Sequence, residues 1–357
     1  MDDSMLLVLY DRITKRSLSR ERVFRDRDNA FDLDDDEFRS RFRLTKEATA
    51  WLCNELRDDL VRRKSRTVIP PEVQLLITLQ FFASGGFQRN VGDHCQLKVA
   101  QSTVSRIMPS VVNSIIRRLG HKISFPRSRE QQLDVSSRFF IISQMPGVVG
   151  AIDCTHIAIK APPASKYNEE SFINRKGFHS INVQVVCDSQ LRILNINPLY
   201  PGRTHDAFIW RNSTLRENFE DGVIGRGLWL LGDSAYPLET WLLTPVGNPS
   251  TAAELNYNAA HRKARNTIER CFGVLKQRFR CLDLKSAGGL QYVPEKSAKI
   301  VMACAILHNI CVAFNIPTEE ICGNDDDDDD DSINEIEHSA NQNAVNVRQQ
   351  LILQRFC

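Results

Sequence analysis

The chain has 357 residues, of which 42% are hydrophobic and 25% charged, a composition typical of a globular protein with a packed core. The formal net charge is only +2, but residues 319–357 carry eleven acidic and two basic side chains, so the rest of the chain is basic. A basic body suits a polyanionic partner. No uninterrupted apolar stretch reaches the roughly 18 residues of a membrane span, and the N-terminus does not resemble a signal peptide. We therefore expect a protein that stays inside the cell and does not enter membranes.

The ten cysteines are scattered along the chain. None belongs to a CxxC pair or to a Cys/His quartet with zinc-ligand spacing. Several lie in apolar stretches, such as Cys187 and Cys304, where cysteine behaves as a small hydrophobic residue. We predict free thiols in a reducing compartment and no zinc site.

Residues 1–35 form a charged segment, and residues 36–125 are predicted to be all helical. One helix follows Thr45, a suitable N-cap, because the stretch LTKEATAWLCNELRDDL places its apolar residues at helical spacing. A second helix begins at the prolines of PPEVQ and ends at Gly85 and Gly86.

The next stretch resembles a helix-turn-helix, with a short helix near residues 88–95 and a second helix beginning AQSTVSRIMPS. Ser102, Thr103 and Arg106 would be exposed at the start of this second helix, where recognition helices present small polar and basic side chains to DNA. A plain three-helix bundle with a polar face explains the pattern equally well. Pro109 is expected to kink or restart the helix.

From Gly147 onwards, short β-branched or apolar stretches predict strands at GVVGAIDC, INVQVVCD, LRILNINPL and GLWLLGDSAY, the second and third forming a hairpin. An amphipathic segment, THDAFIWRNSTLRENFE, lies between the third and fourth strands. Long helices follow in YNAAHRKARNTIERCFGVLKQRFRCL and after Pro294. Residues 126–316 are thus a predicted α/β domain, and residues 317–357 a disordered acidic tail with a short terminal helix.

Three acids occupy special places in this order of elements. Asp153 is predicted at the end of the first strand, Asp233 at the end of the fourth, and Glu269 on the long helix that follows. Two acids on neighbouring strand ends and one on an adjacent helix form the metal site of an RNase H-like core. Mg²⁺ and Mn²⁺ prefer such oxygen ligands, and two such ions about 4 Å apart can drive phosphodiester hydrolysis. Asp153 would bridge the two ions.

Each acid also has a structural alternative. Asp153 or Asp233 could cap a turn, and Glu269 could pair with Arg265 one helical turn earlier. The helix itself argues against the second alternative, because residues 257–280 carry seven basic side chains and Glu269 as their one acid. The three acids together, and no single one of them, predict the metal site.

Other side chains form a predicted second layer around the acids. His156, His205 and Asp206 are candidates for hydrogen bonds to a metal-bound water or a phosphate, although structural histidines are at least as common. The basic residues expected to contact DNA phosphates are Lys160, Arg175, Lys176, Arg203, Arg262 and Arg265.

With these motifs the sequence resembles the PIF/Harbinger transposase superfamily, and most closely its domesticated Harbinger transposase-derived nucleases. The matching segments are GVVGAIDCTHIAIKAP, NRKGFHSINVQVVCD, PGRTHDAFIW, WLLGDSAYPLETWLLTPV, YNAAHRKARNTIERCFGVLKQRFRCL and PEKSAKIVMACAILHNI. The resemblance covers nearly all of residues 36–314. It implies a DDE nuclease with divalent metal ions, whose catalytic acids fall on Asp153, Asp233 and Glu269. It also implies a separate Myb/SANT-like protein that helps bind DNA and reach the nucleus.

We therefore predict a metal-dependent DNA endonuclease of the nucleus, also present in the cytoplasm, that uses two metal ions. Its fold would be an α/β RNase H-like core, a mixed sheet flanked by helices, with an N-terminal helix-turn-helix-like domain. Two alternatives stay open: an active transposase that also transfers strands, and a catalytically silent DNA- or partner-binding factor that retains the fold. An enzyme acting on RNA hybrids has little support. A homo-oligomer is compatible with each alternative.

Overall fold

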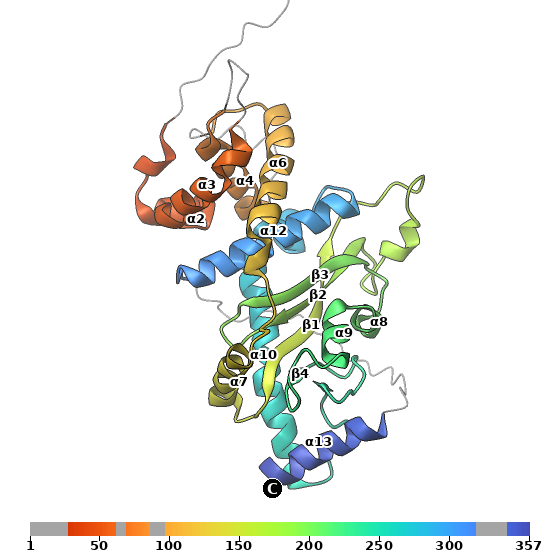
Figure 1. Cartoon of the computed structure of the whole chain (residues 1–357). Helices are drawn as coiled ribbons and strands as arrows, with labels where there is room; N and C mark the ends of the chain where they lie inside the picture. The colour runs from red at the N-terminus through yellow and green to blue at the C-terminus, as the bar shows by residue number, and fades with distance from the viewer. Residues whose placement is uncertain (1–27, 62–68, 86–96, 319–340) are drawn as a thin grey trace, which may run out of the picture.

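The computed structural model describes residues 28–61, 69–85, 97–318 and 341–357. Figure 1 shows a lobe of N-terminal helices on one side of helix α12 (Pro294–Ala313) and a sheet with its covering helices on the other. The seven aspartates at 325–331 lie outside the described residues. The bounds of the short elements are η1 (Ala30–Asp32), η2 (Gly120–Lys122), η3 (Glu169–Phe172), η4 (Arg280–Leu282) and α11 (Leu284–Ala287).

The N-terminal lobe contains helices α2 (Asp35–Phe42), α3 (Lys46–Leu60), α4 (Pro71–Ser84) and α6 (Gln101–Leu119). The predicted caps are present. The Thr45 hydroxyl accepts a hydrogen bond of 3.2 Å from the Ala48 backbone N–H, and Gly85 ends α4 with a left-handed φ of 63°. The assignment of residues 36–125 to a separate DNA-binding domain stays a prediction.

Helix α6 runs as one element through Pro109, so the predicted restart at this proline is wrong. Proline removes a single backbone donor from the helix, while the buried side chains of Met108 and Val111 on either side hold the helix against the core. The first helix of the predicted helix-turn-helix, near residues 88–95, lies outside the described residues.

Five strands form one mixed sheet in the order β3-β2-β1-β4-β5. Strands β1 (Val148–Ala158), β2 (Ser180–Cys187) and β3 (Ile193–Pro201) are antiparallel neighbours, and β4 (Trp229–Leu231) and β5 (Leu242–Leu243) continue the sheet in parallel with β1. The hairpin between β2 and β3 matches the prediction. Strand β5 was not predicted, because two residues are too few to show an alternating pattern.

Helices cover both faces of the sheet (Figure 1). Helices α7 (Arg129–Ser143), α10 (Ala252–Arg278) and α12 pack on one face, and α8 (Asp206–Arg211) and α9 (Thr214–Glu220) on the other. The amphipathic segment after β3 is thus two short helices, and α7 is an additional helix that the sequence analysis missed. A mixed sheet flanked by helices is consistent with the predicted RNase H-like core.

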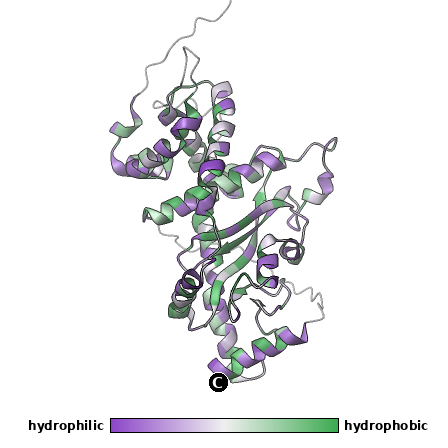
Figure 2. Cartoon of the chain, viewed as in Figure 1, coloured by the Kyte–Doolittle hydropathy of each residue, from purple (hydrophilic) through white to green (hydrophobic). Residues whose placement is uncertain are grey.

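The core is continuous from the N-terminal lobe to the sheet, since buried residues such as Phe42, Leu75 and Val183 belong to one cluster. Figure 2 shows apolar residues gathered on the central strands. Helix α12 joins the two parts. By length and composition it could span a membrane, but 72% of the apolar window is buried inside the protein, as in a core helix.

The C-terminal helix α13 (Gln342–Arg355) packs beside α10. Arg348 donates hydrogen bonds to the backbone oxygens of Thr244 and Pro245, at 3.2 and 3.0 Å. The ring of Phe356 meets Tyr257 edge to face. The predicted terminal helix is therefore present and anchored to the end of the sheet that carries β5.

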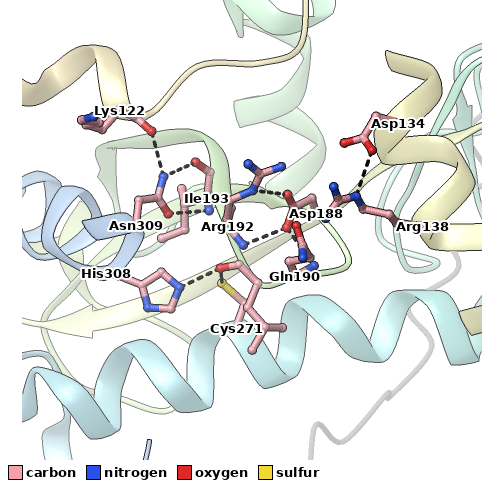
Figure 3. Close-up of polar contacts among 11 residues, drawn as sticks. Lys122, Asp134, Arg138, Asp188, Gln190, Arg192, Ile193, Cys271, His308 and Asn309 are labelled. Carbon is pink, nitrogen blue, oxygen red and sulfur yellow. Dashed lines mark hydrogen bonds and ion pairs between the residues drawn. The ribbon is translucent and has the colours of Figure 1, made fainter. Parts of the chain in front are cut away.

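Asn309 on α12 fixes the sheet to the N-terminal lobe (Figure 3). Its side-chain oxygen accepts a hydrogen bond from Ile193 N–H at 2.8 Å, and its amide nitrogen donates to Ile193 O at 2.8 Å and to Lys122 O at 3.0 Å. His308, beside it, is fully buried and bonds Leu191 O at 2.7 Å, so the structural role predicted for this histidine fits.

Replacing Asn309 with leucine should destabilise the fold by about 3 kcal/mol, because buried backbone groups at Ile193 and Lys122 lose their partners. The measurement is urea unfolding of the full chain. Asn113→Leu, on the exposed face of α6, is the matched control and should change stability by no more than about 0.5 kcal/mol. Equal losses in the two variants would contradict the role given to Asn309.

Candidate metal centre

Asp153 lies in the middle of β1, so its predicted place at the end of a strand is wrong. The strand continues because β2 remains its antiparallel partner as far as the pair Ala158 and Ser180. The parallel partner β4, in contrast, pairs only with Val148–Ala151. Asp153 therefore lies just beyond the point where the parallel half of the sheet stops.

Asp233 follows β4 by two residues and so comes after the same point of the sheet. Its side-chain oxygen accepts a hydrogen bond from Ala235 N–H at 3.1 Å, so the turn-capping alternative is also realised. Asp233 also interacts with Asp153 across the site, because the negative charge of Asp233 raises the pKa of Asp153.

The carboxylate of Asp153 is the electrostatic centre of the site. Its side chain is 13% exposed, and one oxygen accepts a hydrogen bond from Cys154 N–H at 2.7 Å. Burial raises the pKa of Asp153 well above its usual value, and the nearby carboxylates of Asp233 and Asp206 raise it further, while Arg265 lowers it. This group of acids carries surplus negative charge that a cation would offset.

Glu269 joins the site through Arg265 on the same helix. The Arg265 guanidinium donates from Nη1 to Asp153 Oδ2 at 3.2 Å and from Nη2 to Glu269 Oε1. The predicted alternative, an ion pair between Glu269 and Arg265, is therefore present. The same guanidinium also contacts Asp153, so α10 brings Glu269 to the first strand of the sheet.

The three acids thus converge on one region, and their donor set fits Mg²⁺ or Mn²⁺, because all the ligand atoms are carboxylate oxygens. Within the described residues, no three His, Cys, Asp or Glu side chains already stand in metal-binding geometry. The guanidinium of Arg265 bonds to two of the three acids.

Comparison with known proteins gives the family. A family model described as "DDE superfamily endonuclease" matches residues 152–309, a range that includes all three acids and excludes the N-terminal helices. The rat protein named "Putative nuclease HARBI1" is 37% identical over 334 residues, which cover 93% of each chain, and the human protein of that name is 36% identical with the same coverage. The chain belongs to the Harbinger transposase-derived DDE family.

A plant relative shares less of the chain. The Arabidopsis thaliana protein named "Protein ALP1-like" is 27% identical over 296 residues, which cover 77% of this chain and 70% of that protein. No solved structure matches the chain.

On the face of β1 opposite Asp153, polar side chains form a row. His156 Nδ1 lies 3.1 Å from the Ser180 hydroxyl, which also accepts a hydrogen bond of 3.1 Å from Asn174. Asn182, directly across from His156, donates to Asp206 Oδ1 at 2.8 Å. Two of the predicted second-layer residues, His156 and Asp206, are thus each held by a polar side chain of β2.

The hydroxyl of Ser180 lies within hydrogen-bond distance of His156 Nδ1 and accepts a hydrogen bond from the Asn174 side chain. Burial lowers the pKa of His156, Asp206 raises it, and the bases Lys276, Lys176 and Arg175 lower it further.

Sequence analysis missed three residues of this region. Tyr236, three residues after Asp233, bonds through its hydroxyl to Cys154 Sγ and to Gln184, both at 3.3 Å. All lie on the face of the sheet covered by α8 and α9. The apolar pattern that predicted the strands hid this polar row, since Cys154 and Gln184 alternate with buried hydrophobic residues. Every described cysteine is a free thiol, as predicted.

The remaining predicted residues are His205, the basic candidates near the sheet and the polar residues at the start of α6. His205 is exposed before α8 and accepts a hydrogen bond of 3.2 Å from Arg175. The other basic candidates near the sheet are exposed: Lys160, Lys176, Arg203 and Arg262. The start of α6, with Ser102, Thr103 and Arg106, belongs to the N-terminal lobe and lies away from the sheet (Figure 1).

His261 fixes α10 to the parallel end of the sheet, one turn before Arg265. Its Nε2 donates to Leu243 O at 3.1 Å, and burial lowers the pKa of His261 to about 4. The folded protein therefore binds fewer protons here than the unfolded chain between the ordinary pKa of about 6.5 and about 4.

The free energy of unfolding should fall by up to about 3 kcal/mol through His261 as the pH drops from 6.5 to 4, and this contribution is fully present above pH 6.5. His261→Gln, which keeps a donor for Leu243 O, should lack this component. Urea unfolding of both proteins at several pH values measures it. Parallel pH profiles for the two proteins would contradict the assignment.

Proposed function

We propose that the chain is a metal-dependent DNA endonuclease that hydrolyses phosphodiester bonds at Asp153, Asp233 and Glu269. The observation that carries this proposal is the buried carboxylate of Asp153, with Asp233 beside it and Glu269 linked to it through Arg265. Membership of a DDE endonuclease family and the word nuclease in the names of the relatives support the same activity.

Two divalent cations, Mg²⁺ or Mn²⁺, would supply an activated water and neutralise charge on the scissile phosphate. Asp153, Asp233 and Glu269 are the residues that would hold these cations, because Asp153 interacts with Asp233 and shares Arg265 with Glu269. The rest of the chemistry belongs to side chains of the chain. His156, held by Ser180 on the opposite face of β1, is the candidate for a hydrogen bond to a phosphate or to a metal-bound water. Asp206, held by Asn182, adds negative charge beside Asp153.

DNA would approach over the exposed basic residues Lys160, Arg175, Lys176, Arg203 and Arg262. We further propose that residues 36–125 form a DNA- or partner-binding domain, and that a Myb/SANT-like protein assists DNA binding and nuclear entry. The protein would act in the nucleus and also occur in the cytoplasm.

Purified full-length protein should nick supercoiled plasmid in Mg²⁺ or Mn²⁺, and EDTA should stop the reaction. Asp153→Asn, Asp233→Asn and Glu269→Gln should each lower the rate by about a thousandfold or more, because several kcal/mol of charge stabilisation are lost. Asp134→Asn on the surface of α7, where Asp134 pairs with Arg138 (Figure 3), is the matched control and should leave nicking unchanged.

A catalytically silent DNA- or partner-binding factor is the second candidate, and one observation favours it: Arg265 already neutralises two of the acids. An inactive wild type in both metals, also with a Myb-like partner present, would select this candidate. A transposase differs in a further product, since it would join a labelled 3′-hydroxyl end to the plasmid in the same assay.

If the start of α6 contacts phosphates, Arg106→Ala should weaken DNA binding at all sequences and make the slope of log Kd against log salt shallower by about one unit. Fluorescence anisotropy of a labelled duplex over a salt series measures this. Arg138→Ala on α7, far along the chain from α6, is the control. An unchanged slope in Arg106→Ala would assign this surface to a protein partner or to solvent.

A further inference from the structure

Arg265 forms ion pairs with two of the three acids at once. Its two terminal nitrogens reach two different acids, Asp153 at 3.2 Å through Nη1 and Glu269 through Nη2. The Arg265 side chain is 20% exposed, against 13% for Asp153 and 45% for Glu269. The guanidinium therefore lies between a nearly buried carboxylate and one that faces solvent.

The geometry of the site explains why a cation is held there. The Asp153 side chain lies in the middle of β1 and is only 13% exposed, and Arg265 donates a hydrogen bond to it from α10. An arginine keeps its charge at all physiological pH values, and its planar fork can bind two carboxylates at once.

The carboxylates that Arg265 contacts are two of the three proposed metal ligands. Asp153 Oδ2 and Glu269 Oε1 each accept a hydrogen bond from Arg265, and a hard cation needs the lone pairs of such oxygens as ligands. A metal ion close to the guanidinium would be repelled by it. The guanidinium and a metal ion would therefore compete for these carboxylates.

We propose that Arg265 is the resident counter-ion of the metal-free site and that it competes with divalent cations for Asp153 and Glu269. This inference rests on the proposed metal-dependent function. It means that a metal ion reaches these two carboxylates by displacing the arginine. Because the Arg265 side chain is long and partly exposed, it can leave the carboxylates without moving α10.

The test measures Mn²⁺ binding to the full-length protein by isothermal titration calorimetry, in the absence of DNA. Arg265→Gln should bind Mn²⁺ about tenfold more tightly than the wild type, the effect of removing a competing interaction of about 1.4 kcal/mol. Arg265→Lys should bind about threefold more tightly, since a point charge cannot bridge both acids. Arg270→Gln removes the same charge from the exposed surface of α10 and should match the wild type.

Thermal unfolding gives a second readout that does not depend on activity. Without metal, Arg265→Gln should melt at a lower temperature than Arg270→Gln, because the acids then repel one another unopposed. Saturating Mn²⁺ should raise its melting temperature more than that of the wild type.

Equal or weaker Mn²⁺ binding by both Arg265 variants, with binding still abolished by Asp153→Asn, would overturn the counter-ion role and leave the metal site intact. Wild-type binding that survives Asp153→Asn unchanged would overturn the metal site and the counter-ion together. If Arg265→Gln does not fold, the affinity of Arg265→Lys alone decides between these outcomes.

Discussion

Burying the carboxylate of Asp153 in the central strand of the sheet is the constraint on which the site depends. An ionised carboxylate loses several kcal/mol of hydration when it is buried, unless a cation or hydrogen bonds compensate for the loss. Here the compensation comes from the Cys154 backbone N–H and from Arg265, while Asp233 and Asp206 add to the cost. A divalent cation, with twice the charge of an arginine, would offset this cost further, which is the basis of the proposed metal site.

The fold places the acids through the two halves of its sheet. Strand β1 has a long antiparallel partner on one side and a short parallel partner on the other, so the sheet is complete around Asp153 only towards β2. The chain leaving β4 then delivers Asp233, and α10 crosses the same region with Arg265 and Glu269. His261 and Asn309 hold α10 and α12 to the sheet, and this keeps the helix-borne and strand-borne groups in register.

The two faces of β1 carry different sets of polar side chains. On the α10 face lies the acid group with its charge compensation. On the α8 face, Ser180 bonds to His156 and Asn182 bonds to Asp206, so β2 holds a histidine and a fourth carboxylate. Because successive residues of a strand point to opposite faces, one short stretch of sequence supplies both. The family match spans this whole arrangement, whereas the N-terminal lobe lies outside it.

Local chemistry in the sequence was enough to predict the helix caps at Thr45 and Gly85, the strands β1 to β4 and the free cysteines, whereas the catalytic role of the three acids stays a prediction. The confirmed features depend on neighbouring residues, and these can be read along the chain. The middle-strand position of Asp153, strand β5 and the polar row with Tyr236 required the folded structure. They arise from partners far apart in sequence, as Arg265 and Asp153 illustrate with a separation of 112 residues. A pattern within one segment cannot encode such a contact, because the contact exists only when the sheet and α10 pack together.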